Sequence, residues 1–168
     1  MTEEVKQRVV KERILLNIDR CIECGSCQAA CYYSHNEMPV VQSARRGPAL
    51  LPAICRQCVD AACVAACPAD AMIRDENGVV RRALFRCIGC GSCARACPFG
   101  VLPVDVTRRQ IAKCDLCFDR VVDGDAVPRC VAACPAGALQ FADERKAAEE
   151  HLLVLGGRTI GQDRFKRR

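Results

Sequence analysis

The chain has 168 residues, which suits one domain of ordinary size or two very small ones. Sixteen residues are cysteine and only seven are aromatic, a composition that excludes a large conventional core and requires bound clusters to fill the interior. The formal charge of +5 is weak evidence for nucleic acid or a membrane surface.

Residues 1–12 are charged and contain no apolar segment of the kind found in signal peptides, so a cytoplasmic protein is expected. Structural disulfides are rare in the cytoplasm, where clustered cysteines more often bind metal or carry out redox chemistry. The longest apolar run near the end of the chain is the four residues from Leu152 to Leu155. No membrane anchor of its own is therefore expected.

The segment 13–19 predicts a strand that leads into the first cysteine motif, spaced C-x2-C-x2-C-x3-C. The motif consists of Cys21, Cys24, Cys27 and Cys31. Because no Pro follows Cys31, the chain is expected to continue as a helix to about residue 36. Residues 37–51, which contain Pro and Gly, are predicted to be irregular.

The second motif has four residues in its central gap but keeps the C-x3-C-P ending. It consists of Cys55, Cys58, Cys63 and Cys67. Residues 71–81 follow as two strand-like runs around Asn77-Gly78, which is the strongest short signal for a β-hairpin. The sequence therefore predicts a hairpin that joins the second motif to the third.

The third motif is a complete C-x2-C-x2-C-x3-C-P run, a spacing typical of bacterial [4Fe-4S] ligation. It consists of Cys87, Cys90, Cys93 and Cys97. In such motifs the first three thiolates bind one cluster and the fourth binds another. Pro98 ends the helix and biases Cys97 toward extended backbone, which turns its sulfur toward the partner cluster. Residues 99–106 are expected to be extended, and Pro103 favours a sheet edge.

The fourth motif contains a twelve-residue insert, which is predicted to hold a helical turn. It consists of Cys114, Cys117, Cys130 and Cys134. Residues 138–141 are expected to form a closing strand. Asp143 is then expected to cap a helix that runs to about Leu155 and ends at Gly156-Gly157.

Three segments hold no predicted ligand and are therefore expected to dock partners: residues 1–12, 37–52 and the basic tail after Gly157. The two histidines are weak catalytic candidates. His151 is expected to be a solvated surface residue, and His35 a surface or packing residue, although cluster tuning or proton relay remains an alternative for it. No Gly-rich nucleotide loop is present, so a non-catalytic chain is predicted.

Spacing alone permits tandem pairing of the motifs (first with second, third with fourth) or nested pairing (first with fourth, second with third). The strands favour nesting, because the hairpin 71–81 joins the two inner motifs and the strand entering the first motif can pair with the strand leaving the fourth. Nested pairing gives four ligand sets: Cys21, Cys24, Cys27 and Cys134; Cys31, Cys114, Cys117 and Cys130; Cys55, Cys58, Cys63 and Cys97; and Cys67, Cys87, Cys90 and Cys93. Four [4Fe-4S] clusters with about two negative charges each would change the formal charge of +5 to about −3.

The motif order, together with the segments 114–120 and 130–139, resembles the four-cluster iron-sulfur subunits of molybdenum and tungsten oxidoreductases, such as those of dimethyl sulfoxide reductase and formate dehydrogenase. The resemblance covers residues 14–141. It implies nested pairing, two ferredoxin-like halves related by a pseudo-twofold axis, and clusters that form a wire. The short chain is most similar to the small subunit of tungsten aldehyde oxidoreductases.

The expected fold is therefore α+β, with short hairpins and helices around two ferredoxin-like halves that each hold two [4Fe-4S] clusters. Residues 1–54 plus 98–142 are expected to form the half with the first and fourth motifs. Residues 55–97 are expected to form an inserted half with the second and third motifs. Residues 143–168 are expected to form a C-terminal helix and a basic docking tail.

The expected function is relay of single electrons between a catalytic tungsten- or molybdenum-pterin subunit, preferably of the aldehyde oxidoreductase type, and a flavin/NAD(H) subunit or other acceptor. Carbon monoxide dehydrogenase and hydrogenase are alternative partners, and the sequence leaves open whether copies stack into a longer wire. A zinc-binding nucleic-acid module is a remote alternative, because zinc sites join two separated cysteine pairs and need neither the third cysteine nor the Pro.

Overall fold

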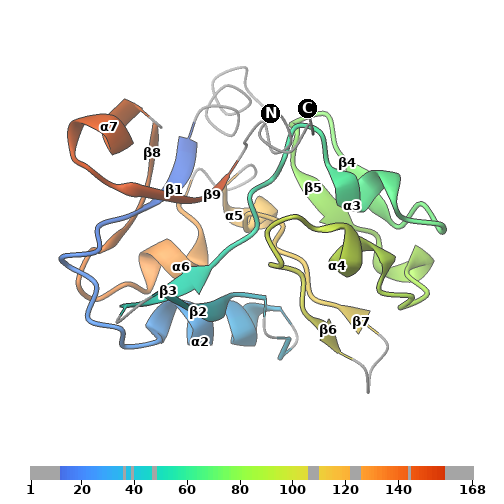
Figure 1. Ribbon diagram of the computed structural model, residues 1–168, viewed down its shortest axis with the longest axis horizontal. Helices are drawn as coiled ribbons and strands as arrows, with labels where there is room; N and C mark the ends of the chain where they lie inside the picture. The colour runs from blue at the N-terminus through green and yellow to red at the C-terminus, as the bar shows by residue number, and fades with distance from the viewer. Residues whose placement is uncertain are drawn as a thin grey trace.

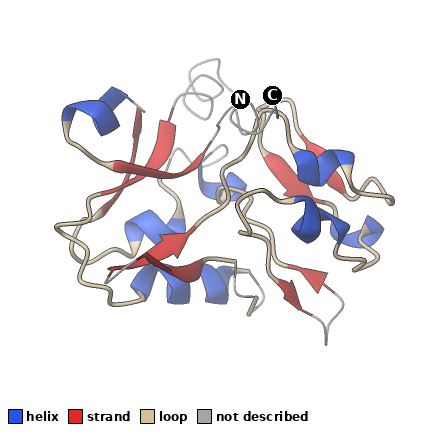
Figure 2. Cartoon of the chain, in the orientation of Figure 1, coloured by secondary structure: helices blue, strands red, loops and turns tan. Residues whose placement is uncertain are grey.

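The computed structural model describes residues 12–35, 37–38, 40–46, 49–105, 110–121, 126–143 and 145–157. Short helices and short strands form two lobes (Figures 1 and 2). The first lobe holds β1 (Glu12–Leu16), α2 (Ser26–Ser34), β2 (Gln42–Arg46), β3 (Ala49–Ala53), α6 (Arg129–Ala132), β8 (Leu139–Asp143), α7 (Arg145–Glu149) and β9 (Leu153–Gly157). The second lobe holds α3 (Ala62–Ala65), β4 (Met72–Arg74), β5 (Val80–Arg82), the 3-10 helix η1 (Leu84–Arg86), α4 (Ser92–Ala96), β6 (Val104–Asp105) and β7 (Gln110–Ile111). Between the lobes lies α5 (Phe118–Val121).

A three-stranded antiparallel sheet, in the order β8-β1-β9, closes one end of the first lobe. The central strand β1 is apolar, and its residues from Ile14 to Leu16 are almost completely buried. Leu16 pairs with Leu139 of β8. This confirms the prediction that the strand entering the first motif pairs with the strand leaving the fourth.

The predicted hairpin between the second and third motifs is also confirmed. β4 and β5 pair antiparallel from Met72 opposite Arg82 to Arg74 opposite Val80. Gly78 has a φ of 75° in the turn, a left-handed conformation that glycine adopts without strain. The helix that was expected to continue beyond Cys31 is confirmed as well, because α2 extends to Ser34. The other α-helices in the described part of the chain have four or five residues.

The helix expected from Asp143 to Leu155 is wrong in length. Asp143 does accept a hydrogen bond from the backbone N–H of Arg145 at 2.9 Å, but α7 ends at Glu149. His151 then adopts a left-handed backbone with a φ of 53°, which breaks the helix. The apolar run that follows becomes the strand β9, which pairs with the open side of β1.

The prediction that residues 37–51 are irregular is wrong for most of the described part of this segment. Gln42 to Ala53 forms an antiparallel hairpin in which β2 pairs with β3. Of the segment 99–106, only Val104–Asp105 is a strand, and it pairs with β7 at a two-stranded edge. Residues 1–11 and 158–168, expected to dock partners, lie outside the described residues.

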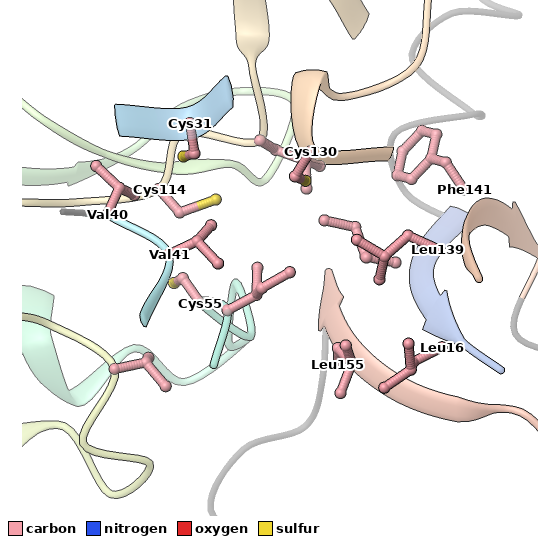
Figure 3. Packing of buried hydrophobic residues seen from close by; sticks show 14 of the residues in the cluster. Leu16, Cys31, Val40, Val41, Cys55, Cys114, Cys130, Leu139, Phe141 and Leu155 are labelled. Atoms are coloured by element: carbon pink, nitrogen blue, oxygen red, sulfur yellow. The ribbon is translucent and has the colours of Figure 1, made fainter. Parts of the chain in front are cut away.

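Cysteine side chains form part of both larger hydrophobic cores. In the first core, Leu16, Leu139 and Leu155 share one cluster with several thiols (Figure 3). The second core contains Met72, Val80, Cys93, Leu102 and Ile111. Of the residues near β6 and β7, Leu102 and Ile111 therefore belong to the second core, while their neighbours Val101 and Ala112 belong to the first. No helix in the described part of the chain is both long enough and apolar enough to cross a bilayer.

Candidate iron-sulfur sites

Each cysteine motif is a turn that leads into a short helix, and the third motif shows how the sequence sets this geometry. Gly91 has a φ of 74° at the N-cap of α4, where a side chain would be strained. The helix ends after Ala96, and Cys97 takes an extended backbone with φ −71° and ψ 113°, as Pro98 predicts. As a result Cys97 lines a different cavity from the other three cysteines of its motif.

Three cavities are each lined by four cysteines, three from one motif and one from another. Site A consists of Cys21, Cys24, Cys27 and Cys134. Site C consists of Cys55, Cys58, Cys63 and Cys97. Site D consists of Cys67, Cys87, Cys90 and Cys93. Sites A, C and D contain the same cysteines as three of the four ligand sets that nested pairing gives. That these cysteines bind clusters stays a prediction.

The remaining four cysteines form site B, which is entirely buried: Cys31, Cys114, Cys117 and Cys130. Cys31 on α2 is close enough to each of the other three for charges on their sulfurs to interact. Figure 3 shows Cys31, Cys114 and Cys130 gathered in the interior, with Cys55 nearby. All sixteen thiols therefore fall into four groups of four.

The four sites form a row. Cys27 of site A interacts electrostatically with Cys130 of site B, and Cys114 of site B interacts with Cys55 of site C. The helices α3 and α4, which carry cysteines of sites C and D, pack against each other. The order is thus A-B-C-D, and the two exposed thiols, Cys24 and Cys90, belong to the end sites.

The two exposed thiols differ in chemistry from the buried ones, because burial raises the pKa of Cys27 in site A and Cys93 in site D as well as that of thiols in the interior sites. Sγ of Cys24 lies 3.3 Å from Oγ of Ser26, and Sγ of Cys90 lies 3.4 Å from Oγ of Ser92. These contacts lower the pKa of both thiols. Burial instead raises the pKa of Cys63 to about 11, and it raises the pKa of the site B thiols Cys114, Cys117 and Cys130. Metal loading of the interior sites must therefore displace protons from buried thiols.

Backbone N–H groups also point at cysteine sulfurs. The N–H of Ala71 donates to Sγ of Cys67 at 3.2 Å, and the N–H of Arg129 donates to Sγ of Cys117 at 3.4 Å. Such N–H···S contacts stabilise negative charge on a cluster ligand and raise its reduction potential.

Two observations test whether these residues fit an iron-sulfur cluster. Among the described side chains, no three His, Cys, Asp or Glu residues converge closely enough to hold a single metal ion. The thiols surround cavities instead, as a multi-iron group requires. At site D, Arg82 lines the cavity, and its buried Nη1 atom has no hydrogen-bond partner. A group that brings negative charge and sulfur acceptors would satisfy this donor.

Lys113 and Gln57 form a buried polar network between sites B and C. Nζ of Lys113 donates to the carbonyl oxygens of Val80, at 2.7 Å, and Cys114. Nε2 of Gln57 donates to the same Cys114 oxygen at 2.8 Å, and its Oε1 accepts from the N–H of Val80 at 2.7 Å. Burial opposes the charge of Lys113, but interactions with nearby cysteine side chains, chiefly that of Cys55, outweigh this effect and raise the pKa of Lys113.

His35 is paired rather than free. Its Nε2 lies 3.2 Å from Oδ1 of Asp115, and its Nδ1 lies 2.9 Å from the backbone oxygen of Cys31. The Asp115 contact, followed by that with Cys31, raises the pKa of His35 to about 11. These contacts connect α2 to the fourth motif beside site B. They agree better with the packing role expected for His35 than with a free surface position. His151 is exposed, as expected.

Sequence reasoning missed the polar residues that line or separate the sites: Gln57, Arg82 and Lys113. Each lies near a cysteine motif or in a strand, where a polar or charged side chain ordinarily faces water. Their burial depends on contacts across the lobes, such as Lys113 with Val80, which lie 33 residues apart. A weak signal was present for Gln57 and Lys113, since they directly precede Cys58 and Cys114.

Comparison with known proteins adds independent evidence. The sequence profile of the 4Fe-4S dicluster domain family matches residues 46–144, and that of a 4Fe-4S binding domain matches residues 18–34. Together these matches include all four cysteine motifs.

Three curated relatives show the range of similarity. The thiosulfate reductase electron transfer subunit PhsB of Salmonella typhi is 37% identical over 136 residues, covering 73% of this chain and 70% of the relative. The electron transport protein HydN of Escherichia coli K12 is 34% identical over 160 residues, covering 79% and 89%. The formate dehydrogenase-O iron-sulfur subunit of the same strain is 33% identical over 155 residues, covering 76% of this chain but only 51% of its own length.

Proposed function

This chain belongs to the 4Fe-4S dicluster domain family, and from that membership we propose that it is a non-catalytic electron-transfer subunit that holds four [4Fe-4S] clusters, one in each of sites A to D. The grouping of sixteen thiols into four sets of four carries the proposal, because each set supplies the four thiolates that one cluster needs. A bound cluster accepts or releases one electron at a time. The row of sites then offers a path from the exposed end at Cys24 to the exposed end at Cys90.

The two lobes are proposed to be two ferredoxin-like halves related by a pseudo-twofold axis. Sites A and B, built from the first and fourth motifs, would belong to one half, and sites C and D, built from the second and third, to the other. The packing of Leu102 and Ile111 supports assigning β6 and β7 to the second half rather than ending it at residue 97.

The proposed partner is the catalytic subunit of an oxidoreductase complex. Relatives named as subunits of thiosulfate reductase and formate dehydrogenase support this assignment. A tungsten- or molybdenum-pterin enzyme of the aldehyde oxidoreductase type is the favoured candidate, with a flavin/NAD(H) subunit or another acceptor at the other end. A hydrogenase or carbon monoxide dehydrogenase companion is the second candidate, and HydN, named as an electron transport protein, is compatible with either.

Iron content tests the proposal directly. Protein purified without oxygen is expected to hold about sixteen irons per chain, to absorb near 400 nm, and to lose this absorbance on reduction with dithionite. Protein treated with an iron chelator serves as the control. Colourless protein that retains stoichiometric zinc instead would exclude electron transfer and favour the zinc alternative.

One end of the row has the surface expected for partner contact. Leu84 and Ile88 are 54% and 64% exposed, and Phe85 is fully exposed. These three residues, which we call the site D patch, shortly precede the exposed Cys90 in the sequence, and Ile88 lines the site D cavity with it. The stretch 77–104 that contains them has four arginines and no acidic residue. We therefore propose that the site D patch binds a partner subunit whose redox centre lies behind an apolar surface with an acidic rim.

Replacing Phe85 with Ser is expected to reduce the amount of partner subunit that co-purifies with this chain by at least about tenfold, because exposed aromatic residues often dominate interface energies. Tyr33→Ser is the matched control, since Tyr33 is 76% exposed but lies on α2 in the first lobe. Both variants should keep their full iron content. Equal recovery of the partner with the two variants would exclude this patch as the interface.

A further inference from the structure

Lys113 carries a positive charge that interacts with cysteines of two different sites. Its side chain is only 6% exposed. The ammonium group hydrogen-bonds Cys55 and lies close enough to Cys63 and Cys114 to interact with their charges. Because Cys55 and Cys63 belong to site C and Cys114 to site B, the lysine lies at the junction of the two central sites.

A purely structural role does not account for a charged group at this position. The neutral side chain of Gln57 already bridges the same two backbone segments, since it hydrogen-bonds both Val80 and Cys114. Burying an ammonium group is costly unless negative charge lies nearby. No carboxylate of the described residues forms an ion pair with Lys113, so the compensating charge comes from the cysteine sites.

We propose that Lys113 is a positioning residue that raises the reduction potentials of the two central sites together and so keeps them available to electrons passing between the lobes. This inference rests on the proposed electron-transfer function. Reduction adds one negative charge to a site, and a fixed positive charge nearby stabilises that added charge. A residue shared by sites B and C shifts both potentials in the same direction, so the difference between them changes less than either potential does.

The test is an anaerobic redox titration of the whole chain followed by electron paramagnetic resonance. In Lys113→Met, the ratio of reduced to oxidised cluster at a given potential is expected to fall by at least about tenfold for two of the four clusters, as Coulomb's law gives for unit charges within roughly 10 Å in a protein interior. For a one-electron couple, a tenfold change corresponds to about 59 mV. The reduction potentials of the other two clusters should change little. Site A serves as the internal reference, because Glu23 and no Lys or Arg lines its cavity.

Two controls separate charge from structure. Lys113→Arg keeps the positive charge and should retain the potentials of the unaltered chain. Lys146→Met makes the same chemical change on α7, where the lysine forms a surface ion pair with Glu150, and should shift no cluster. Unchanged central potentials in Lys113→Met with four clusters bound would overturn the inference, as would equal shifts in the Met and Arg variants.

Cluster loss is also decisive. If Lys113→Met and Lys113→Gln lose the two central clusters while Lys113→Arg keeps all four, the charge is required and the inference stands. If all three variants lose them equally, the lysine acts through its shape and the inference fails. Failure of the proposed function is distinguishable from either result, because the unaltered chain would then contain no clusters to titrate.

Discussion

Anaerobic removal of iron is expected to unfold most of this chain. The main hydrophobic cluster is built around thiols as well as aliphatic side chains, and the sulfurs of Cys31, Cys114 and Cys130 face its interior (Figure 3). If the proposed clusters bind as inferred, removing iron breaks the bonds that cross-link the four motifs. Only seven aromatic residues are available to compensate, and most of the helices have four or five residues, which is too short for independent stability.

Circular dichroism before and after chelation measures this effect. The helical signal should fall sharply and the cooperative thermal transition should disappear. A small cysteine-free cluster of Leu15, Ala147 and Leu152 under the sheet is expected to retain the most protection from hydrogen exchange. A transition midpoint that moves by only a few degrees would show that the polypeptide supports its own core.

Cys27→Ala and Cys31→Ala are expected to remove different clusters, although the two residues lie one helical turn apart on α2. Cys27 groups with Cys134 in site A, whereas Cys31 groups with Cys130 in site B. Each single variant should lose the [4Fe-4S] signal of one cluster out of four. Combining Cys27→Ala with Cys134→Ala should cost no further cluster, while combining it with Cys31→Ala should cost a second.

The same design separates the two ways of pairing the motifs. Tandem pairing would supply the fourth ligand of the first motif from Cys67, so that Cys27→Ala and Cys67→Ala would remove one cluster between them. In the nested arrangement this double variant removes two, because Cys67 lines the cavity of site D. Signal amplitudes from anaerobic electron paramagnetic resonance give the count, with iron analysis as the check.

The elements next to the cysteines were predictable because local chemistry determines them. Asn77-Gly78 specifies a tight turn, and the confirmed hairpin places it between β4 and β5. Pro98 stops α4 within its own motif. At both positions a single residue restricts the backbone, so the structure depends little on distant contacts.

One element that the sequence did not reveal depends on a distant partner. Leu152 and Leu155 are buried and Leu153 is exposed, a spacing of three residues that lacks the strict alternation of a strand, and the run follows a helix with a good cap. Its conformation is decided by β1, which has an open edge about 140 residues earlier in the chain. The pairing of β2 with β3 is local and was missed for a different reason, because Gly47, Pro48 and Pro52 in this stretch suggest a loop.

The exposed thiols at the two ends of the row have a consequence for how the protein fails in air. Dissolved oxygen reaches Cys24 and Cys90 from solvent, whereas every thiol of site B is shielded by protein. Oxidative damage therefore begins at both termini of the conducting row and advances inward. Briefly aerated protein would retain the absorbance of the clusters proposed for the central sites. It would no longer exchange electrons with its partner subunits, because the clusters at the two ends of the row are lost first.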